Sequence, residues 1–592
     1  MIRVVLISIR IIISLILAVI AYRYALFYNL HMFQLNGYKN GEHFVWIRKF
    51  IRRQWVLIAG VVIGIATVIF PGAVTDWVTL LWFLLIIAVY QALCGMSQKK
   101  PLVYTARVKR LTATVIVLDV ILLCAGILAW DKAEGLFIAG AAGSRVFARV
   151  LGFKLFYGGY GTLARLDGIL MITVGLKILS CIIANIVNKP IERAVSDHFI
   201  NDAKRILREA KDMTIIGVTG SYGKTSVKYY LGELLSAKYN VLITPESYNT
   251  PMGVVRTLRE RMKPGTEIFV CEMGARHVGD IKELCDLVHP HHGIITSIGP
   301  QHLETFFNME NIVSTKYELA DALPKDGMLF LNWDNEYVRG NAGKYSNVIG
   351  YSGTEREQVH DPDAADKQQD NVVSSGISQS TEAHMPGETK TQPRYSAHNI
   401  ILTPQGTTFE VSAPDGESET YTTSLIGAHN IVNITGAIAV AHSMGIALKD
   451  LRIPVRRLRS VPHRLELKRN SKINIIDDAY NSNPVGSKAA LDTLALFDGM
   501  KIMITPGMVE LGDKEEEYNY EFGRHAAEVC DHLLLVGHGR TDAIRRGAED
   551  CIDRISQIRT FDHFEDAFAY ASQIPCDTEK YILLENDLPD NY

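Results

Sequence analysis

The first third of the chain is dominated by long apolar runs. Residues 4–22 form one run that is interrupted only by Arg10. An arginine at mid-span costs about 2.5–3.5 kcal/mol, whereas each of the dozen or so Val, Ile and Leu residues around it returns about 0.3–0.6 kcal/mol. Further spanning helices are predicted over residues 55–70, 77–93, 112–129 and 168–188. We therefore expect residues 1–190 to form a multi-span membrane region of about five helices.

The positive charges between these runs predict the orientation of the region. Loops 23–54 and 94–111 contain clusters of Lys and Arg, whereas loop 71–76 contains none. Because basic loops stay on the cytoplasmic side, five spans would place everything after about residue 189 in the cytoplasm. Segment 131–167 would then lie outside although it is also basic, and an additional re-entrant or interfacial helix there would accommodate its charges. We expect a multi-pass protein of the cell membrane.

Ionisable residues also lie inside the predicted spans, namely Arg10, Asp119 and Lys177. Such residues form either a polar site within the helix bundle or structural ion pairs and snorkelling contacts. The pattern favours the structural alternative.

The hydrophobic pattern changes at about residue 213, where short apolar runs begin to alternate with helical periodicity. Residues 213–220 predict a strand that ends in a glycine, and residues 221–239 have helical periodicity. The joint between them predicts a phosphate-binding loop made of Gly220, Ser221, Tyr222, Gly223, Lys224, Thr225 and Ser226. In such a loop Lys224 would reach the β- and γ-phosphates and the Thr225 hydroxyl would bind Mg²⁺, although Val218 stands where the usual motif has its first glycine.

Three further residues follow predicted strands of the same region. Glu272 ends the apolar run 268–272, and a carboxylate at the carboxyl end of a parallel strand suits Mg²⁺. His302 and Lys316 come after a third predicted strand. Taken alone, each of these residues fits a structural or surface role better.

Composition explains how the two patterns coexist in one chain. The 592 residues carry a net charge of −3 and are 48% hydrophobic, and their mean hydropathy of +0.08 is the average of a membrane part and a soluble part. Near-zero net charge gives no support for a nucleic-acid partner. The eight cysteines show no CxxC spacing, which argues against a zinc or redox motif and suits a reducing compartment. Segment 353–395 is polar and predicts a disordered insertion.

The last part of the chain, from about residue 465, again alternates strands with helices. It predicts a Rossmann-like parallel sheet, and no GxGxxG motif indicates a dinucleotide. The predicted fold class is thus an α-helical membrane region followed by α/β, with a P-loop-type central ATP-binding domain and a Rossmann-like C-terminal domain. The predicted boundaries are 1–190 for the membrane region, 191–212 for a connecting helix, 213–462 for the central domain and 463–592 for the C-terminal domain.

Several motifs of the soluble part occur in an order that resembles the Mur ligase family, the cytoplasmic ATP-dependent amide ligases that build the stem peptide of peptidoglycan. The motifs are TGSYGKTS (219–226), NTPMG (249–253), EMGA (272–275), HLE (302–304), Lys316 in STKYEL, GAHNIVN (427–433), Arg464, DDAYNSNP (477–484) and GMVELG (507–512). The resemblance covers about residues 213–592. The residues and spacing of the last two motifs look most like those of the MurF branch, which adds D-alanyl-D-alanine.

The resemblance implies an enzyme that uses ATP and Mg²⁺. A substrate carboxylate attacks the γ-phosphate and becomes an acyl phosphate, and an incoming amine then displaces phosphate to give an amide. The implied substrates are a cell-wall precursor, either a sugar nucleotide or a lipid-linked muramoyl peptide, and an amino acid or dipeptide. Positioning and charge neutralisation are the tasks that this chemistry leaves to the protein.

The resemblance also implies a role for each matching residue. Lys224, Glu272, His302 and Lys316 form the implied catalytic set. Thr225 and Glu272 hold one Mg²⁺, His302 lies near a second metal, and Lys316 matches a lysine that is often carbamylated to bind that metal. His429 and Asn430, which alone would fit an N-cap pair, match residues that contact adenine. Arg464 matches a phosphate contact and Asp478 a ribose contact.

The resemblance stops before residue 213. Mur ligases carry an N-terminal α/β domain that holds the UDP-sugar, and here membrane spans stand in its place. Three interpretations follow. The first is a membrane-tethered MurF-like ligase, the second a Mur-type ligase that acts on a different and lipid-linked carboxylate, and the third a non-catalytic membrane nucleotide-binding protein.

Overall fold

The computed structural model describes residues 2–95, 101–141, 163–353, 395–470, 473–480, 482–539, 541–551 and 557–586. Residues 354–394 of the predicted insertion and most of segment 131–167 lie outside the described residues. The chain forms two compact units, one built on residues up to Asp197 and the other from His198 onward. Each unit is described separately below.

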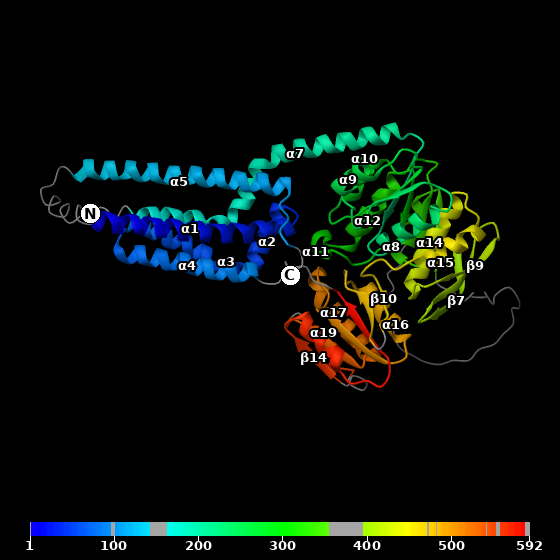
Figure 1. Ribbon diagram of the computed structural model, residues 1–592. Coiled ribbons are helices and arrows are strands. Elements are labelled where there is room, and N and C mark those ends of the chain that lie inside the picture. The colour runs from blue at the N-terminus through cyan, green and yellow to red at the C-terminus, as the bar shows by residue number, and fades with distance from the viewer. Residues whose placement is uncertain are drawn as a thin grey trace, which may run out of the picture. The chain divides into compact units, whose positions relative to one another are not determined.

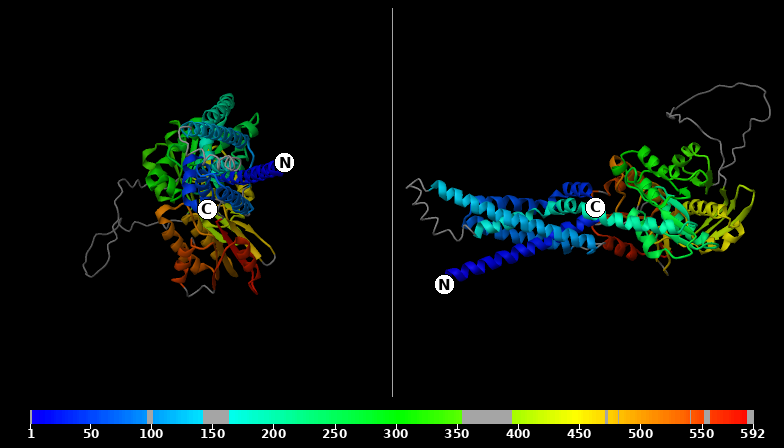
Figure 2. Two further views of the ribbon diagram at one scale, coloured as in Figure 1. Left: turned by 90° about the vertical axis from the view of Figure 1, so that its left-hand side faces the viewer. Right: turned by 90° about the horizontal axis from the view of Figure 1, so that it is seen from above.

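The first unit is a bundle of long helices that run alongside one another (Figures 1 and 2). They are α1 (Ile2–Leu35), α2 (Asn40–Lys49), α3 (Ile51–Ile69), α4 (Ala73–Gly95), α5 (Ala106–Ala141), the helix Leu163–Gly175 and α7 (Lys177–Glu209). Within the described residues, four helices are long and apolar enough to cross a membrane, and they overlap the first four predicted spans.

The fifth predicted span, 168–188, differs from a straight helix. The helix Leu163–Gly175 and α7 meet at an angle of 64°, so this span is broken in two. Lys177, the first residue of α7, is fully buried, and its Nζ donates to Asp119 of α5 at 2.5 Å. The hydroxyl of Tyr22 in α1 donates to the same carboxylate at 2.7 Å. The break therefore lies where an ion pair joins three helices.

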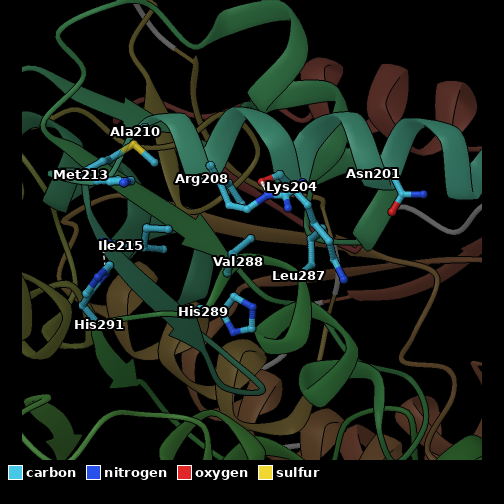
Figure 3. A pocket seen from close by; sticks show the side chains of 12 residues that line it. Asn201, Lys204, Arg208, Ala210, Met213, Ile215, Leu287, Val288, His289 and His291 are labelled. Atoms are coloured by element: carbon cyan, nitrogen blue, oxygen red, sulfur yellow. Dashed lines mark hydrogen bonds between the residues drawn. The ribbon is translucent and has the colours of Figure 1, made fainter.

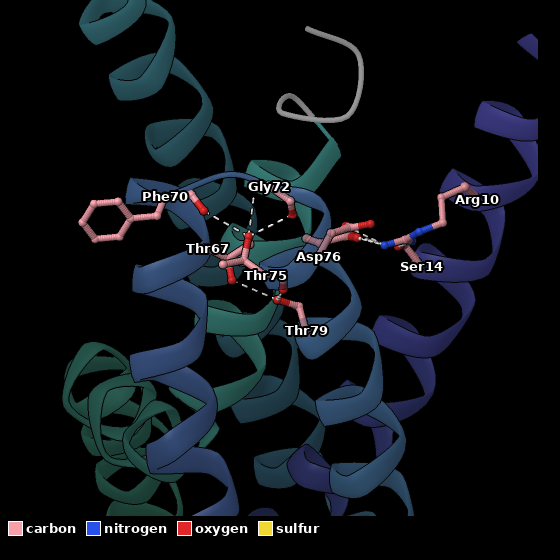
Figure 4. Close-up of polar contacts among 9 residues, drawn as sticks. Arg10, Ser14, Thr67, Phe70, Gly72, Thr75, Asp76 and Thr79 are labelled. Carbon is pink, nitrogen blue, oxygen red and sulfur yellow. Dashed lines mark hydrogen bonds and ion pairs between the residues drawn. The ribbon is translucent and has the colours of Figure 1, made fainter. Parts of the chain in front are cut away.

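The other ionisable residue of the predicted spans is also paired. Arg10 of α1 donates through Nη2 to Asp76 at 2.6 Å and to Asp167 at 2.8 Å, and the Ser14 hydroxyl donates to Asp167 at 2.8 Å (Figure 4). An intramembrane charge is stabilised when it is paired within the bundle. Arg10, Asp119 and Lys177 thus make interhelical ion pairs, which fits the structural alternative.

Small residues let α3 and the helix Leu163–Gly175 approach closely. A Cβ added to Gly168 would lie 2.7 Å from the Gly64 carbonyl oxygen, and a Cβ added to Gly64 would lie 2.7 Å from the Gly168 carbonyl oxygen. Close backbone approach through glycine is a common way to pack helices in membranes, where lipid supplies little hydrophobic drive.

The second unit begins with a nine-stranded sheet of strand order β2-β3-β1-β4-β5-β6-β7-β8-β9. Strands β2 to β7 run parallel, whereas β8 and β9 form an antiparallel extension. The strands are β1 (Thr214–Thr219), β2 (Val241–Ile243), β3 (Ile268–Glu272), β4 (His292–Ile295), β5 (Leu329–Asn332), β6 (Val348–Ser352), β7 (Tyr395–Thr403), β8 (Gly406–Ser412) and β9 (Ser418–Thr423).

Helices cover both faces of this sheet because its strands are apolar on both sides. Ile216 packs in one core cluster with α8 (Lys224–Leu235) and α14 (Ala428–Ser443), whereas Ile215 packs in another with α9 (Pro251–Arg261) and α10 (Asp280–Val288). Successive side chains of a strand point to opposite faces, and a parallel sheet buries both. The remaining helices are α11 (Leu303–Phe306), α12 (Met309–Asp321), α13 (Glu336–Arg339) and α15 (Arg452–Arg457).

A second, six-stranded sheet has the order β10-β11-β15-β12-β13-β14, and only β10 runs antiparallel. Its elements are β10 (Glu466–Lys468), β11 (Ile473–Asp478), α16 (Pro484–Ala495), β12 (Met500–Thr505), α17 (Glu515–Val529), β13 (His532–Val536), α18 (Asp542–Glu549), β14 (Gln557–Phe561), α19 (Phe564–Gln573) and β15 (Lys580–Glu585). The α/β class with parallel sheets, predicted for this part of the chain, is confirmed.

The glycine contact in the first unit predicts a measurable effect on stability. Gly168→Ala should lower the melting temperature of the detergent-solubilised protein, because overpacking against backbone atoms costs about 1–3 kcal/mol. Gly41→Ala is the matched control, since a Cβ at this helical position meets nothing within 4 Å. Equal melting temperatures for the two variants would contradict the close packing of the two helices.

Candidate functional site

The parallel sheet gathers the predicted site residues at one edge. Strand β1 lies between β3 and β4 and is parallel to both. The segments that follow these three strands therefore meet at the carboxyl edge of the sheet, where ligands of open α/β sheets bind. These segments contain the loop after β1, Glu272 at the end of β3, and His302 after β4.

The loop between β1 and α8 depends on two glycines with positive φ. Gly220 has φ 147° and Gly223 has φ 81°, a region in which other residues are strained. A Cβ at Gly220 would collide with Thr296, and one at Gly223 would lie 2.7 Å from Asn433 Oδ1. The backbone N–H of Ser221 donates to the Ser297 carbonyl at 2.6 Å, which ties the loop to the segment after β4.

Lys224 begins helix α8 and folds back over this loop. Its Nζ donates to the carbonyls of Gly220 and Ser221, each at 2.8 Å. Burial lowers the pKa of Lys224 to about 8, against the attraction of Glu272, and nearby Arg464 lowers it further. The ammonium thus lies beside the amides of a helix N-terminus, which is the arrangement that binds phosphate groups.

Glu272 is almost completely buried, with a relative exposure of 1%. Its Oε1 accepts from the Thr225 hydroxyl at 3.1 Å and from Asn249 Nδ2 at 3.2 Å. Burial alone would raise the pKa of Glu272, but the charges of Lys228 and Lys224 outweigh burial, so the pKa is lowered. A carboxylate and a hydroxyl oxygen at this distance are donors of the kind that Mg²⁺ prefers.

Two partners of Glu272 were missed by the sequence reasoning. Lys228 is fully buried and its Nζ lies 2.9 Å from Glu272 Oε2, and it also donates to the Glu246 carbonyl. Its position four residues after Lys224, on the same face of α8, was the available signal. Asn249 belongs to the quoted motif NTPMG, but nothing in the motif shows which side chain it contacts.

His302 and Lys316 lie in the segments that follow β4, and the charge of Lys224 affects the pKa of both. His302 has φ 56°, and its Nδ1 hydrogen-bonds Glu510 Oε2 of the C-terminal sheet's domain. Burial lowers the pKa of His302, and the bond to Glu510 raises it by less, so the imidazole is neutral near pH 7. With Nδ1 donating to a carboxylate, Nε2 keeps its lone pair and suits a metal.

Lys316 lies in α12 with a relative exposure of 3%. Burial lowers its pKa well below the ordinary value, and the charge of Lys224 lowers it further. Its Nζ lies 5.9 Å from the centroid of the Phe306 ring. Burial therefore disfavours the charged ammonium form of this side chain.

Glu510 is a third residue that the sequence reasoning did not single out. It lies in the quoted motif GMVELG, has φ 64°, and places its Oε1 3.7 Å from Arg276 of the first sheet's domain. Together with the bond to His302, it connects the two domains of the second unit at the site.

His429 and Asn430 lie at the start of α14, but neither caps that helix, whose N-cap is Gly427. The Asn430 amide donates to the Ile426 carbonyl at 2.8 Å and accepts from the Tyr230 hydroxyl at 2.7 Å. The His429 Nδ1 is buried without a hydrogen-bond partner among the described residues, and burial lowers its pKa to about 4. Asn430 thus joins α14 to α8, whereas His429 keeps a free polar atom.

Arg464 and Asp478 belong to the C-terminal sheet and the segment before it. The guanidinium carbon of Arg464 lies 4.5 Å from the centroid of the Tyr480 ring, and Tyr480 hydrogen-bonds Ser247 at 2.5 Å. Asp478 ends β11, accepts from the Leu465 N–H at 3.1 Å, and has its pKa raised to about 6 by burial. Among the described residues, neither His429 nor Asp478 hydrogen-bonds the loop 220–226.

Two other features of the described residues lie apart from the predicted set. A cavity of about 430 Å³ lies at the opposite edge of the sheet, between the end of α7 and α10, and its lining includes Lys204, Arg208 and His289 (Figure 3). Asp415, Glu417 and His442 lie close enough to hold a metal ion, in an exposed position near the β8–β9 turn. None of the predicted site residues belongs to either feature.

Comparison with known proteins assigns both domains of the second unit. Residues 218–392 match the Mur ligase middle domain, and residues 463–584 match the Mur ligase, glutamate ligase domain. Together these two matches cover about half of the chain. The chain thus contains the middle and C-terminal domains of the Mur ligases, and through them it belongs to the Mur ligase family.

Two relatives of the chain carry the same name. UDP-N-acetylmuramoyl-tripeptide–D-alanyl-D-alanine ligase of Escherichia coli (strain K12) is 29% identical over 335 residues, which are 56% of this chain and 66% of the relative. The ligase of the same name from Bacillus subtilis (strain 168) is 31% identical over 324 residues, which are 54% of this chain and 62% of the relative. The chain therefore spans slightly less than two thirds of the length of these relatives.

Solved structures show the same fold. MurF from Acinetobacter baumannii aligns with a TM-score of 0.54 and 24% identity, over 66% of this chain and 77% of that one. MurF ligase from Thermotoga maritima in complex with ADP aligns with a TM-score of 0.54 and 23% identity, over 67% of this chain and 81% of that one.

The Lys228–Glu272 pair predicts a large effect of removing one partner. Lys228→Met should destabilise the full-length protein by about 3–5 kcal/mol, because it leaves a buried carboxylate without its counter-charge. Adding Glu272→Gln should restore most of that loss in a thermal unfolding assay.

Lys282→Met is the matched control for this prediction. Lys282 pairs with Asp286 at 2.6 Å, but both side chains are exposed, so the loss should stay within about 1 kcal/mol. A Lys228→Met variant that is as stable as the control would refute the interpretation of the buried pair.

Proposed function

We propose that this protein is an ATP-dependent amide ligase of cell-wall precursor synthesis, which adds D-alanyl-D-alanine to a muramoyl peptide. The observation that carries the proposal is the convergence of Lys224, Thr225 and Glu272 at the carboxyl edge of the first parallel sheet. The names of the relatives support the same reaction.

The loop Gly220–Ser226 is the proposed phosphate-binding loop of a P-loop-type domain. Its two positive-φ glycines let the backbone turn so that the first amides of α8 face an anion. Lys224 would exchange its two loop carbonyls for the β- and γ-phosphates of ATP, which are stronger acceptors because they are charged. Tyr222 and Ser226 belong to the same proposed site.

Thr225 and Glu272 would hold Mg²⁺, which when bound neutralises charge on the phosphates. The fit rests on Glu272 Oε1, which faces the Thr225 hydroxyl, whereas Oε2 is held by Lys228. The protein's own contribution is then to hold the substrate carboxylate in line with the γ-phosphate. The carboxylate oxygen forms the new bond to phosphorus as the bond to the ADP oxygen breaks.

His302 and Lys316 are the proposed ligands of a second metal. The neutral amine of Lys316 can add carbon dioxide and lose a proton to form a carbamate, which supplies an anionic oxygen. The bond from His302 Nδ1 to Glu510 leaves Nε2 available on the opposite side of the ring. Since Glu510 belongs to the C-terminal domain, the His302–Glu510 hydrogen bond would also couple the metal site to domain closure. Closure of the domains would exclude water from an acyl phosphate.

The remaining predicted residues would bind the adenine, ribose and phosphate groups of the nucleotide. We assign His429 and Asn430 to adenine, Arg464 to phosphate and Asp478 to ribose. The Rossmann-like C-terminal domain would deliver the incoming amine, whose nitrogen attacks the acyl carbon, expels phosphate and loses a proton. The domain boundaries 213–462 and 463–592 belong to the same proposal.

The membrane part distinguishes this proposal from its runner-up. Residues 1–190 would be a multi-pass region with residues 191–212 as the connection, and in the sequence their long apolar helices precede the matched Mur ligase domains. This observation favours, as the second candidate, a ligase of the same chemistry that acts on a lipid-linked carboxylate. A non-catalytic nucleotide-binding protein would need neither the buried Glu272 nor a second metal site.

The proposed reaction makes a direct prediction. Purified full-length protein with Mg-ATP, UDP-MurNAc-tripeptide and D-alanyl-D-alanine should release phosphate, and Lys224→Ala should reduce the rate at least about 100-fold because the γ-phosphate loses its counter-charge. Lys282→Ala, an exposed lysine away from the site, should leave the rate unchanged.

The outcomes separate the candidates. Release only with a lipid-linked muramoyl peptide would favour the second candidate over the first. A fully active Lys224→Ala variant would remove the loop from the site, and no release with either acceptor would leave the non-catalytic interpretation.

The proposed orientation is tested independently of activity. A reporter fused after Tyr592 should behave as a cytoplasmic one, because an odd number of spans follows an external start and because the ligase needs ATP. An external signal from the fusion would contradict the assignment of the basic loops to the cytoplasm.

A further inference from the structure

Two carboxyl groups lie side by side at the carboxyl edge of the second sheet. Asp478 ends β11 and Glu585 ends β15, and the two residues are register partners in the parallel pair of these strands. Glu585 has a relative exposure of 0%. Its side chain belongs to none of the quoted motifs, and no role has been assigned to it above.

The hydrogen-bond donors around Glu585 account for only one of its oxygens. Oε1 accepts from the hydroxyls of Ser482 and Ser487, each at 2.7 Å. Oε2 is buried and has no donor among the described residues. The Asp478 carboxyl interacts directly with Glu585, but two ionised carboxylates only accept hydrogen bonds. A proton between them is the one donor that satisfies both groups.

The charged groups around Asp478 and Glu585 balance a single negative charge on this pair. From the segment before β10, Arg464 attracts Asp478. Asp477 of β11 adds repulsion, but its Oδ2 is held by Lys468 at 2.5 Å and by His463 at 2.9 Å. Helix α16 contributes the Ser487 hydroxyl, and the Asn586 amide that follows β15 donates to the Gly507 carbonyl. One proton and Arg464 together balance the two carboxyl groups.

We propose that Glu585 is a positioning residue that holds this shared proton. Its protonated carboxyl group donates a hydrogen bond to Asp478 and so fixes the orientation of the Asp478 carboxylate for the ribose of ATP. The inference rests on the proposed function, in which Asp478 contacts the ribose. Burial raises the pKa of Glu585 well above its ordinary value, and the neighbouring Asp478 raises it further, in agreement with a protonated side chain.

The activity test compares two substitutions of Glu585. Glu585→Gln keeps a donor of the same shape and should change the KM for ATP by less than about 3-fold, whereas Glu585→Leu fills the space without a donor and should raise it about 10-fold, with a smaller change in kcat. In the wild type, deprotonation of the pair should raise the KM for ATP at alkaline pH. The Gln variant should not show this rise. Equal KM values for the two variants, or an alkaline rise that the Gln variant retains, would overturn the positioning role.

A second measurement needs no substrate and therefore separates this inference from the proposed function. A carboxyl group whose pKa is raised by folding binds its proton more tightly in the folded state, so its contribution to stability decreases as pH rises from the unfolded value of about 4.3 through the folded pKa. The melting temperature of Glu585→Gln minus that of the wild type should therefore increase between pH 6 and pH 9. Asp478→Asn should show the same trend, because the pair shares one proton.

Each outcome of the stability test is decisive. A difference in melting temperature that does not change with pH for either variant would overturn the shared proton, whatever the activity. A pH-dependent difference in a protein that releases no phosphate would support the proton and refute only the ligase proposal. Glu565→Gln, an exposed carboxylate of α19, is the control and should show no trend.

Discussion

The site depends on one topological constraint, the position of β1 between β3 and β4 in a parallel sheet. Parallel neighbours deliver the residues that follow each strand to the same edge, so Lys224, Glu272 and His302 meet although they are far apart in the sequence. The apolar residues on both faces of β1 maintain this position, because the helices that cover the sheet pack against them. The chemistry of the edge thus follows from the burial of the strands.

Charge at that edge is balanced within a small volume. The charge of Arg464 lowers the pKa of both Lys224 and Lys228, and Glu272 is the buried counter-charge that the two lysines share. An excess of positive charge beside a helix N-terminus is suited to a ligand with several negative charges, such as a nucleotide triphosphate. At the edge of the second sheet the excess charge is negative instead. There two buried carboxyl groups lie near one arginine, and they retain a proton.

The helical unit, whose helices are long and apolar enough to cross a membrane, is subject to a different constraint, because its buried charges need partners within the bundle. Its ionisable residues are therefore joined across helices, Arg10 to Asp76 and Asp167, and Lys177 to Asp119. The break before Lys177 lies beside one of these ion pairs, and the glycines Gly64 and Gly168 let two helices approach closely. The helical unit lies outside the residues that match the two Mur ligase domains.

The sequence alone determined the apolar spans, the α/β alternation and the loop Gly220–Ser226, because hydrophobic periodicity and glycine spacing are local properties of a chain. It also indicated the family through motifs that are each contiguous. The partners Lys228, Asn249, Glu510 and Glu585 were decided only by the tertiary structure. Each makes its contact with a residue distant in sequence, and no local pattern records which buried carboxylate will face a lysine, a histidine or another acid. Periodicity predicts which residues are buried, but only packing decides which charges meet.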